Sequence, residues 1–221
     1  MACTLVPINL DNVSEYEELR IQRIACGWNS APEILNSWRE KQAEGLKSFF
    51  WITTKPTTET STELSSSSSS SLPSSTPATF IRAGHISLDA YIDPPDESVA
   101  NASKTALTIR TFFIMPQHRA AGLGSASMKL LESFATSAPY GSPNCEFITL
   151  DCMSKKHYYD PVLGPHVRKI MPICNQEWYE KMGYVVWKVE PRYEEQLVLD
   201  SGEVREVVYD AAFMRKRVSR A

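Results

Sequence analysis

The sequence predicts a single α/β domain whose sheet has both antiparallel and parallel neighbours, because strand-like runs and amphipathic helical patterns follow one another in a mixed order. The chain has 221 residues, 43% hydrophobic and 22% charged, an ordinary globular composition. Residues 55–78 include an unbroken run of serines at 65–71 and carry too little apolar surface to fold. About 197 residues remain, enough for one core. We expect one domain over 1–221, interrupted by a disordered Ser/Thr-rich loop at about 55–78.

The first half of the chain predicts a strand, two helices and a hairpin. Residues 3–8 alternate as a short strand. Pro32 suits the first turn of the second helix, which Gly45 ends. Residues 49–52 and about 79–91 indicate two strands of a hairpin whose connection holds the serine run. The first helix ends at Gly27, and its apolar positions are Tyr16, Leu19, Ile21, Ile24 and Ala25.

The second half predicts a strand at 105–115, ended by Pro116, and then a helix that runs through Ser137. Another strand follows at 147–152, and residues 153–174 show no regular pattern. That long segment is basic and aromatic, so it would either shape a binding pocket or form a solvated loop. A short helix near 177–182 ends at Gly183, and strands at about 184–190 and 204–215 complete the chain.

The charge balance argues against partners that need a basic protein. With 23 basic and 26 acidic residues the net charge is −3, so we expect neither nucleic acid nor a membrane as partner. No apolar run approaches the roughly 20 residues of a membrane span, and the start has no leader pattern. Five scattered cysteines without a CxxC pair predict free thiols and no metal site. We expect a cytoplasmic or nuclear protein, either a monomer or a homodimer.

The turn before the central helix has the composition of an anion-binding site. Gly122-Leu-Gly124 stands between a strand and an amphipathic helix, where unpaired N–H groups and about half a positive charge favour a pyrophosphate. An ordinary strand-to-helix turn that needs positive φ would look the same. The chain has no G-x-x-x-x-G-K-[ST] motif, and Ser127 replaces the last glycine of the dinucleotide motif, which weakens both nucleotide readings.

Two segments together resemble the GNAT superfamily of N-acetyltransferases. The first is Arg119-Ala-Ala-Gly122-Leu-Gly124, which is similar to the superfamily's acyl-CoA turn, and the second is Trp178-Tyr179-Glu-Lys-Met-Gly183-Tyr184, which is similar to its other signature. The resemblance implies a mixed, mostly antiparallel twisted sheet with helices on both faces. It also implies acetyl-CoA as co-substrate and no metal.

The resemblance further implies roles for individual residues. Tyr179 would be the general acid for the departing thiolate, since a phenol with a pKa near 10 is protonated at neutral pH. A packed aromatic on a short helix is the structural alternative. The pantetheine arm would pair with the backbone of Phe112, Phe113 and Ile114. The pyrophosphate would be bound by Arg119, Ala120, Ala121, Gly122, Leu123, Gly124 and Ser125.

The general base is the missing part of this pattern. Thr108 and Arg110 occupy the positions where several superfamily members carry it, and neither is a base. Asp151, at the end of the next strand, is the first candidate, with a turn-capping role as its alternative. Arg110 would either recognise an acceptor carboxylate or phosphate, or form a structural ion pair. Weaker candidates for the base are His85, His157, Asp160 and Glu177.

The sequence therefore predicts an N-acetyltransferase that transfers acetyl from acetyl-CoA to a primary amine by direct attack, with a small molecule as the favoured acceptor. A peptide or protein N-acetyltransferase is the alternative among enzymes. A non-catalytic acyl-CoA-binding regulatory module is the alternative outside them, and the missing base favours it.

Overall fold

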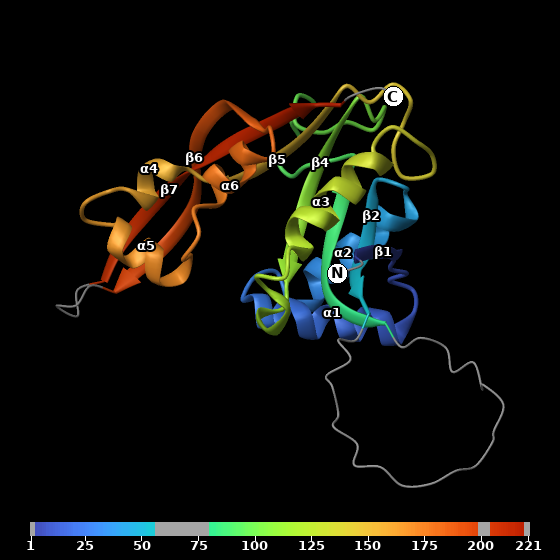
Figure 1. The fold of residues 1–221 in the computed structure, drawn as a ribbon, viewed down its shortest axis with the longest axis horizontal. Coiled ribbons are helices and arrows are strands. Elements are labelled where there is room, and N and C mark those ends of the chain that lie inside the picture. Colours follow the sequence, from blue (N-terminus) through green and yellow to red (C-terminus); the bar gives the residue numbers. More distant parts are fainter. Residues whose placement is uncertain (1–2, 56–79, 199–203, 219–221) are drawn as a thin grey trace, which may run out of the picture.

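One sheet of seven strands organises the molecule. The structure, a computed structural model, describes residues 3–55, 80–198 and 204–218. The strand order is β1-β2-β3-β4-β5-β7-β6, and among the described strands only β4 and β5 pair in parallel (Figure 1). The predicted class, α/β with a mostly antiparallel sheet, is confirmed. The strands are β1 (Cys3–Pro7), β2 (Lys47–Thr54), β3 (Ile81–Asp89), β4 (Ala106–Ile114), β5 (Phe147–Met153), β6 (Val185–Val198) and β7 (Val204–Arg217).

Helices cover both faces of the sheet (Figure 1). Strand β2 shows the two layers, because Phe49 and Trp51 pack with α1 and α2 whereas Phe50 and Ile52 pack with α3. Helix α6 lies on the α3 face, and α4 and α5 cover the hairpin of β6 and β7. None of the described helices is long and apolar enough to cross a membrane. The helices are α1 (Val13–Cys26), α2 (Pro32–Ala43), α3 (Leu123–Phe134), α4 (Lys155–Tyr158), α5 (Gly164–Ile170) and α6 (Asn175–Lys181), with a 3₁₀ turn at Pro116–His118.

Most of the predicted elements are confirmed. Strands β2 and β3 pair antiparallel as the predicted hairpin. Their connection, residues 56–79, is the site of the expected disordered loop and lies outside the described residues. Gly27, Gly45 and Gly183 follow the last turns of α1, α2 and α6 with φ of 84°, 72° and 89°. This left-handed backbone ends a helix without strain when the residue is glycine.

Three predictions about the elements are wrong. Ile21 and Ile24 of α1 are 59% and 54% exposed, because the helix instead buries Gln22 and Arg23, which reach a histidine on β3. Residues 153–174 form α4 and α5, which are too short to show a helical period. Strand β6 continues past residue 190 to Val198, where a proline and several charged residues hide the strand pattern.

Strand β4 contains a bulge that bends the middle of the sheet. Two of its residues, Thr111 and Phe112, lie opposite the single residue Ile86 of β3. Thr111 has φ of 48°, a left-handed conformation that costs a non-glycine residue about 1–3 kcal/mol. Its hydroxyl donates a hydrogen bond to Ser87 Oγ at 2.7 Å, and this contact helps to hold the strained backbone.

Gly84 allows β3 to approach the bulged strand. A Cβ at this position would lie 2.2 Å from the carbonyl oxygen of Phe113 and 3.0 Å from Cα of Ile114. Both obstacles are backbone atoms, which a rotamer change cannot move aside. The glycine is therefore required by the packing of two strands, in contrast to the helix-ending glycines.

We expect Gly84→Ala to lower the free energy of unfolding by at least about 2 kcal/mol, because the strands must separate to admit the methyl group. The measurement is urea unfolding followed by circular dichroism. Gly27→Ala is the matched control: no atom lies within 4 Å of the added Cβ, so only the left-handed backbone costs energy, about 1 kcal/mol. A smaller loss for Gly84→Ala than for the control would contradict the close approach of β3 and β4.

Candidate active site

The parallel strands β4 and β5 separate in the middle of the sheet. They pair over three residues only, and the last pair is Thr108 with Thr149. Beyond it, β4 has no strand partner on the β5 side among the described residues. A free strand edge can bind an extended chain through main-chain hydrogen bonds. This edge contains the residues predicted to hold the pantetheine arm, Phe112, Phe113 and Ile114.

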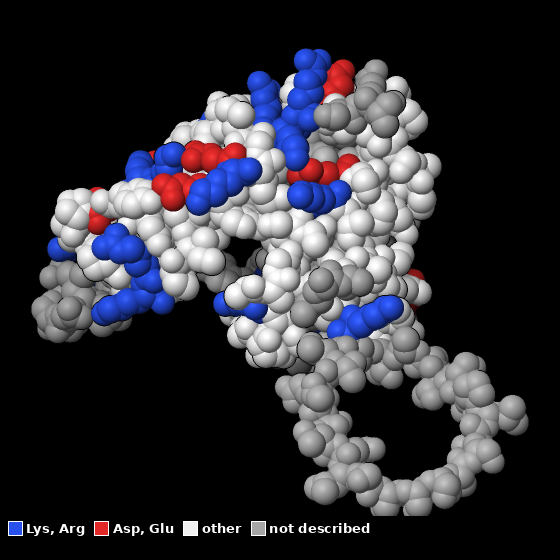
Figure 2. Space-filling model, viewed as in Figure 1, with Lys and Arg blue, Asp and Glu red and all other residues white. Residues whose placement is uncertain are grey.

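A cavity of about 330 Å³ occupies this split. Cys152 and Tyr179 line it from the α3 face, whereas Arg110 and Asp151 line it from the face of α1 and α2. The cavity thus connects the two faces through the gap between the strands. Figure 2 shows a hollow between the part that carries α4 and α5 and the rest of the molecule. The volume suits a small ligand.

A second cavity, of about 900 Å³, lies on the face of α1 and α2. It shares Trp28, Arg110, Thr111 and Phe112 with the first, so the two spaces meet at the bulge of β4. The split is therefore also open to a ligand from the face opposite to α3.

The wall of this second cavity contains a buried ion pair. Lys47 Nζ donates to Asp89 Oδ2 at 2.5 Å and to Ser87 Oγ at 3.2 Å. Burial lowers the pKa of Lys47 and raises the pKa of Asp89, and the charge of each partner opposes the shift of the other. Because Ser87 also accepts from Thr111, the ion pair and the strained bulge belong to one hydrogen-bonded group.

The turn between β4 and α3 presents six consecutive backbone N–H groups. The amides of residues 120–125 donate to no group in the described part of the chain. Ala120 and Gly122 have φ of 63° and 76°, so the backbone curls before the helix begins. Unpaired amides at a helix start form an anion site, to which the helix adds partial positive charge. The predicted cradle is thus brought together: Ala120, Ala121, Gly122, Leu123, Gly124 and Ser125.

The sequence suggests that Arg119 is a forked donor to a phosphate, but in the structure its side chain contacts the protein itself. Its Nε donates to the carbonyl oxygen of Ile114 at 3.0 Å, and its guanidinium lies 5.6 Å from the ring centroid of Phe113. The side chain therefore ties the turn to the end of β4. Its role in cofactor binding stays a prediction.

Gly124 faces two aromatic rings across the entrance to the split. A Cβ at Gly124 would lie 3.4 Å from the Trp178 side chain and 3.6 Å from Phe112, which is ordinary contact. These two rings stack on each other at 6.1 Å between centroids and 28° between planes. A single methyl group at Gly124 would therefore touch both rings, and a larger side chain would have to displace them.

Tyr179 stands on α6 at the wall of the cavity. Its ring packs edge-on against Trp178 and Tyr184, with centroid distances of 4.9 and 6.0 Å. Burial, followed by electrostatic interactions with Cys152 and Asp151, raises the pKa of its phenol above the ordinary value of 10. The phenol is therefore protonated over the whole neutral range and is available as a proton donor.

Asp151, the first candidate for the base, is held by three side chains. Arg110 Nη1 donates to its Oδ1 at 2.6 Å, and the Tyr193 hydroxyl donates to its Oδ2 at 2.6 Å. Arg192 Nε lies 3.7 Å from the same Oδ2. Both oxygens of the carboxylate are thus occupied, and Arg110 forms the ion pair that was the structural alternative. The catalytic role of Asp151 stays a prediction.

The other candidates for the base lie outside both cavities. His85 is buried beneath α1, and burial lowers its pKa well below 6.5. His157 accepts a hydrogen bond from a backbone amide of β7, Asp160 accepts two turn amides, and Glu177 accepts a tyrosine hydroxyl. No group of His, Cys, Asp or Glu in the described ranges is arranged to hold a metal ion.

Sequence reasoning missed the residues that β6 and β7 bring to the cavity. Tyr193 and Glu195 of β6, and Tyr209 of β7, line it together with α5. The signal was present as an alternation, since Tyr193, Glu195 and Leu197 are spaced for one face of a strand. This alternation does not stand out in the sequence, because the predicted strand ends near residue 190 and the alternation lies beyond it.

Compared with known proteins, the chain matches no protein-family model and no curated protein sequence. Solved structures resemble it over its whole length. An aminoglycoside 6'-N-acetyltransferase complexed with coenzyme A is 12% identical with a TM-score of 0.53, over 100% of this chain and 99% of that chain. NAA60 of Arabidopsis thaliana in complex with acetyl-CoA is 11% identical with a TM-score of 0.52, over 98% and 99%. Ard1 from Thermoplasma volcanium is 14% identical with a TM-score of 0.53, over 100% of each chain.

Similarity at this level of identity establishes the fold. Structures of the GNAT family are among the matches, so the resemblance seen in two short signatures extends to the whole chain as the GNAT fold. The split between β4 and β5, the glycine turn and α6 all lie within the region that these structures match.

We expect Gly124→Val to weaken acetyl-CoA binding at least about tenfold while the protein stays folded, because the added methyl groups would occupy the space below Trp178 and Phe112. The measurement is isothermal titration calorimetry, with the unfolding midpoint as the test of folding. Lys129→Val is the control, since it places the same residue on an exposed position of the same helix. Unchanged acetyl-CoA affinity in a folded Gly124→Val protein would contradict the assignment of the turn.

Proposed function

We propose that this chain, which has the GNAT fold, is an N-acetyltransferase that moves the acetyl group of acetyl-CoA to a primary amine. The favoured acceptor is a small molecule. The observation that carries the proposal is the split between β4 and β5. A free strand edge and a protonated tyrosine line it, and the turn with the unpaired amides follows the end of β4. These are the groups needed to hold a pyrophosphate, an extended arm and a leaving thiolate.

The proposed binding mode uses the two faces of the sheet for the two substrates. The amides of residues 120–125 bind the pyrophosphate on the α3 face. The backbone at Phe112, Phe113 and Ile114 pairs with the pantetheine arm, which passes Gly124 and brings the thioester to the cavity. The amine enters from the face of α1 and α2, where the second cavity meets the first.

In the proposed reaction the amine nitrogen attacks the thioester carbon directly. A C–N bond forms and the C–S bond breaks, and the departing sulfur takes a proton from the Tyr179 hydroxyl. Backbone N–H groups on the open edge of β4 stabilise the negative charge that develops on the thioester oxygen. The phenol recovers its proton from solvent or from the acetylated amine.

The amine must lose a proton before it attacks. For an amine with a pKa near 10, that step costs about 4 kcal/mol at pH 7. Asp151 is the carboxylate that lines the cavity beside Tyr179, and we propose it as the group that receives this proton directly or through a water. Its bonds to Arg110 and Tyr193 must then persist or rearrange as the proton arrives.

Two observations bear on the alternatives. The cavity of about 330 Å³ fits a small acceptor better than a folded protein surface, which supports a small-molecule enzyme over a protein N-acetyltransferase. The occupation of both Asp151 oxygens, together with Thr108 and Arg110 on β4, supports the non-catalytic acyl-CoA-binding module as a second candidate.

We expect at least one amine in a panel of small amines and peptides to raise the release of CoA thiol above background. With that amine, Tyr179→Phe should lower kcat about a hundredfold or more. Because burial raises the Tyr179 pKa above 10, its acid form persists and kcat should not fall between pH 7 and 10 through loss of this proton. The measurement is steady-state thiol release with pH profiles. Acetyl-CoA binding should be unchanged in the variant, and binding without release for every acceptor would favour the binding module.

We expect Asp151→Asn to lower kcat and to lower the free energy of unfolding by about 1–3 kcal/mol, because Arg110 loses its charged partner. The measurements are thiol release across pH and urea unfolding. If Asp151 accepts the proton, the pH dependence of kcat is lost in the variant. Retention of the same pH profile at a lower kcat would make Asp151 a positioning residue for Arg110 and Tyr193.

A further inference from the structure

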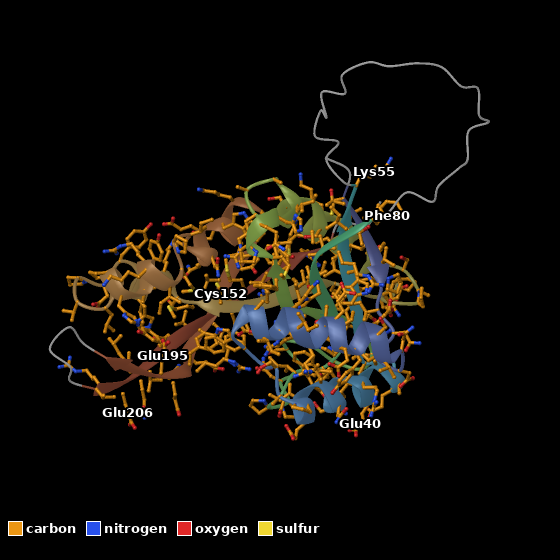
Figure 3. All side chains as sticks on the ribbon, turned by 90° about the horizontal axis from the view of Figure 1, so that it is seen from below. Glu40, Lys55, Phe80, Cys152, Glu195 and Glu206 are labelled. Carbon is orange, nitrogen blue, oxygen red and sulfur yellow. The ribbon has the colours of Figure 1, made fainter. Side chains whose placement is uncertain are left out.

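The hairpin of β6 and β7 directs polar groups into the first cavity. The proposed chemistry gives two of these groups, Glu195 and Tyr209, no role. Tyr193 and Glu195 stand two residues apart on one face of β6, and Tyr209 pairs with Tyr193 from β7. Figure 3 shows Glu195 on the side of the hairpin that faces α4 and α5, and Glu206 on the opposite side. Glu195 therefore points toward the space between hairpin and helices, whereas Glu206 points to solvent.

The cavity has an excess of negative charge. Asp151, Glu194 and Glu195 line it, and Arg110 is the one basic residue among its described lining residues. Arg110 is already paired with Asp151. Glu195 has no ion pair or hydrogen bond with another described side chain, so its charge is available to a ligand. A cavity of this character attracts a cation.

Tyr209 gives an independent indication of a missing ligand. Its side chain is 1% exposed, and its hydroxyl has no hydrogen-bond partner in the described part of the chain. A buried hydroxyl without a partner destabilises the fold, and a ligand that supplies the hydrogen bond would recover that loss. Tyr209 lines the same cavity as Glu195 and lies diagonally across the strand pair from it.

An apolar wall faces these polar groups. Val167 and Ile170 of α5, Met171 just after it and Met153 at the end of β5 line the cavity opposite the hairpin. Because a strand rises about 3.3 Å per residue, Glu195 lies roughly 7 Å farther along β6 than Tyr193, which holds Asp151. The cavity thus has a reacting end at Asp151 and Tyr179, an anionic end at Glu195, and an apolar wall opposite the hairpin that joins them.

We propose that the acceptor carries a second cationic group, separated from the reacting amine by an apolar spacer, and that Glu195 with Tyr209 binds this second cation. The acceptor class is a linear diamine, or a larger amine with the same two ends. This inference rests on the proposed N-acetyltransferase function and names its substrate class. In this arrangement Glu195 is a specificity-determining residue and takes no part in the chemistry.

The first experiment measures binding alone. Putrescine and cadaverine are titrated into the protein by calorimetry, against butylamine and pentylamine as monoamines of the same length. We expect each diamine to bind at least about tenfold more tightly than its monoamine, and Glu195→Gln to abolish this difference. Glu206→Gln is the matched control, because it removes the same charge from the opposite face of the same hairpin. Equal binding of diamines and monoamines, or an equal effect of both variants, would overturn the proposal.

A second variant separates binding from folding. Tyr209→Phe removes the unpartnered hydroxyl, so it should leave the unfolding midpoint unchanged or raise it while it weakens diamine binding. Unchanged diamine affinity in Tyr209→Phe would remove Tyr209 from the site.

Kinetics then distinguish the two levels of the proposal. With diamine acceptors, Glu195→Gln should raise KM about tenfold and leave kcat nearly unchanged, and with monoamines it should change neither. If thiol release from diamines is the same in Glu195→Gln as in the unchanged protein, the proposed diamine site is wrong and the proposed acetyltransferase activity is retained. Selective diamine binding without any thiol release would support the site and overturn the proposed enzyme.

Discussion

The left-handed backbone of Thr111 is the constraint on which the site depends. Leu107 and Ile109 face α3, and in a regular strand residue 111 would follow them. The extra residue of the bulge shifts this pattern, so that Phe112 and Ile114 face α3 instead. The pairing of β4 with β5 ends at Thr108, just before the bulge, and the free edge that follows lines the cavity. The strained residue thus lies where the edge proposed to bind the thioester arm meets the passage between the two faces.

This strain persists because polar groups beneath the bulge hold it. The Ser87 hydroxyl accepts hydrogen bonds from Thr111 and from Lys47, and it donates one to the carbonyl oxygen of Arg110. Lys47 also forms the ion pair with Asp89. Lys47 and Asp89 are nearly fully buried, and the desolvation of such a pair offsets much of its attraction. The pair therefore contributes little net stability but fixes the geometry of β2, β3 and β4 at the one place where the sheet departs from regular pairing.

The parts of the fold that could be predicted are those with local causes. Glycines after helices, the hairpin and the turn at Gly122 and Gly124 follow from residue types and short-range patterns. The bulge could not be predicted, because threonine is a good strand former and its conformation is imposed by β3. The prediction for the buried face of α1 is wrong for a similar reason. Gln22 and Arg23 are buried because they contact His85, which is distant in the sequence.

The same distinction separates the two halves of the candidate site. The half proposed to bind acetyl-CoA is built by one contiguous turn and the strand before it, so a short signature reveals it. The half proposed to bind the acceptor is built by β6, β7 and α5, whose residues meet only because Tyr193 pairs with Tyr209 and its hydroxyl reaches Asp151. No single segment carries that information. In the proposed enzyme, acceptor choice therefore depends on tertiary pairing, and Glu195 can change without disturbing the groups proposed to bind acetyl-CoA or to transfer its acetyl group.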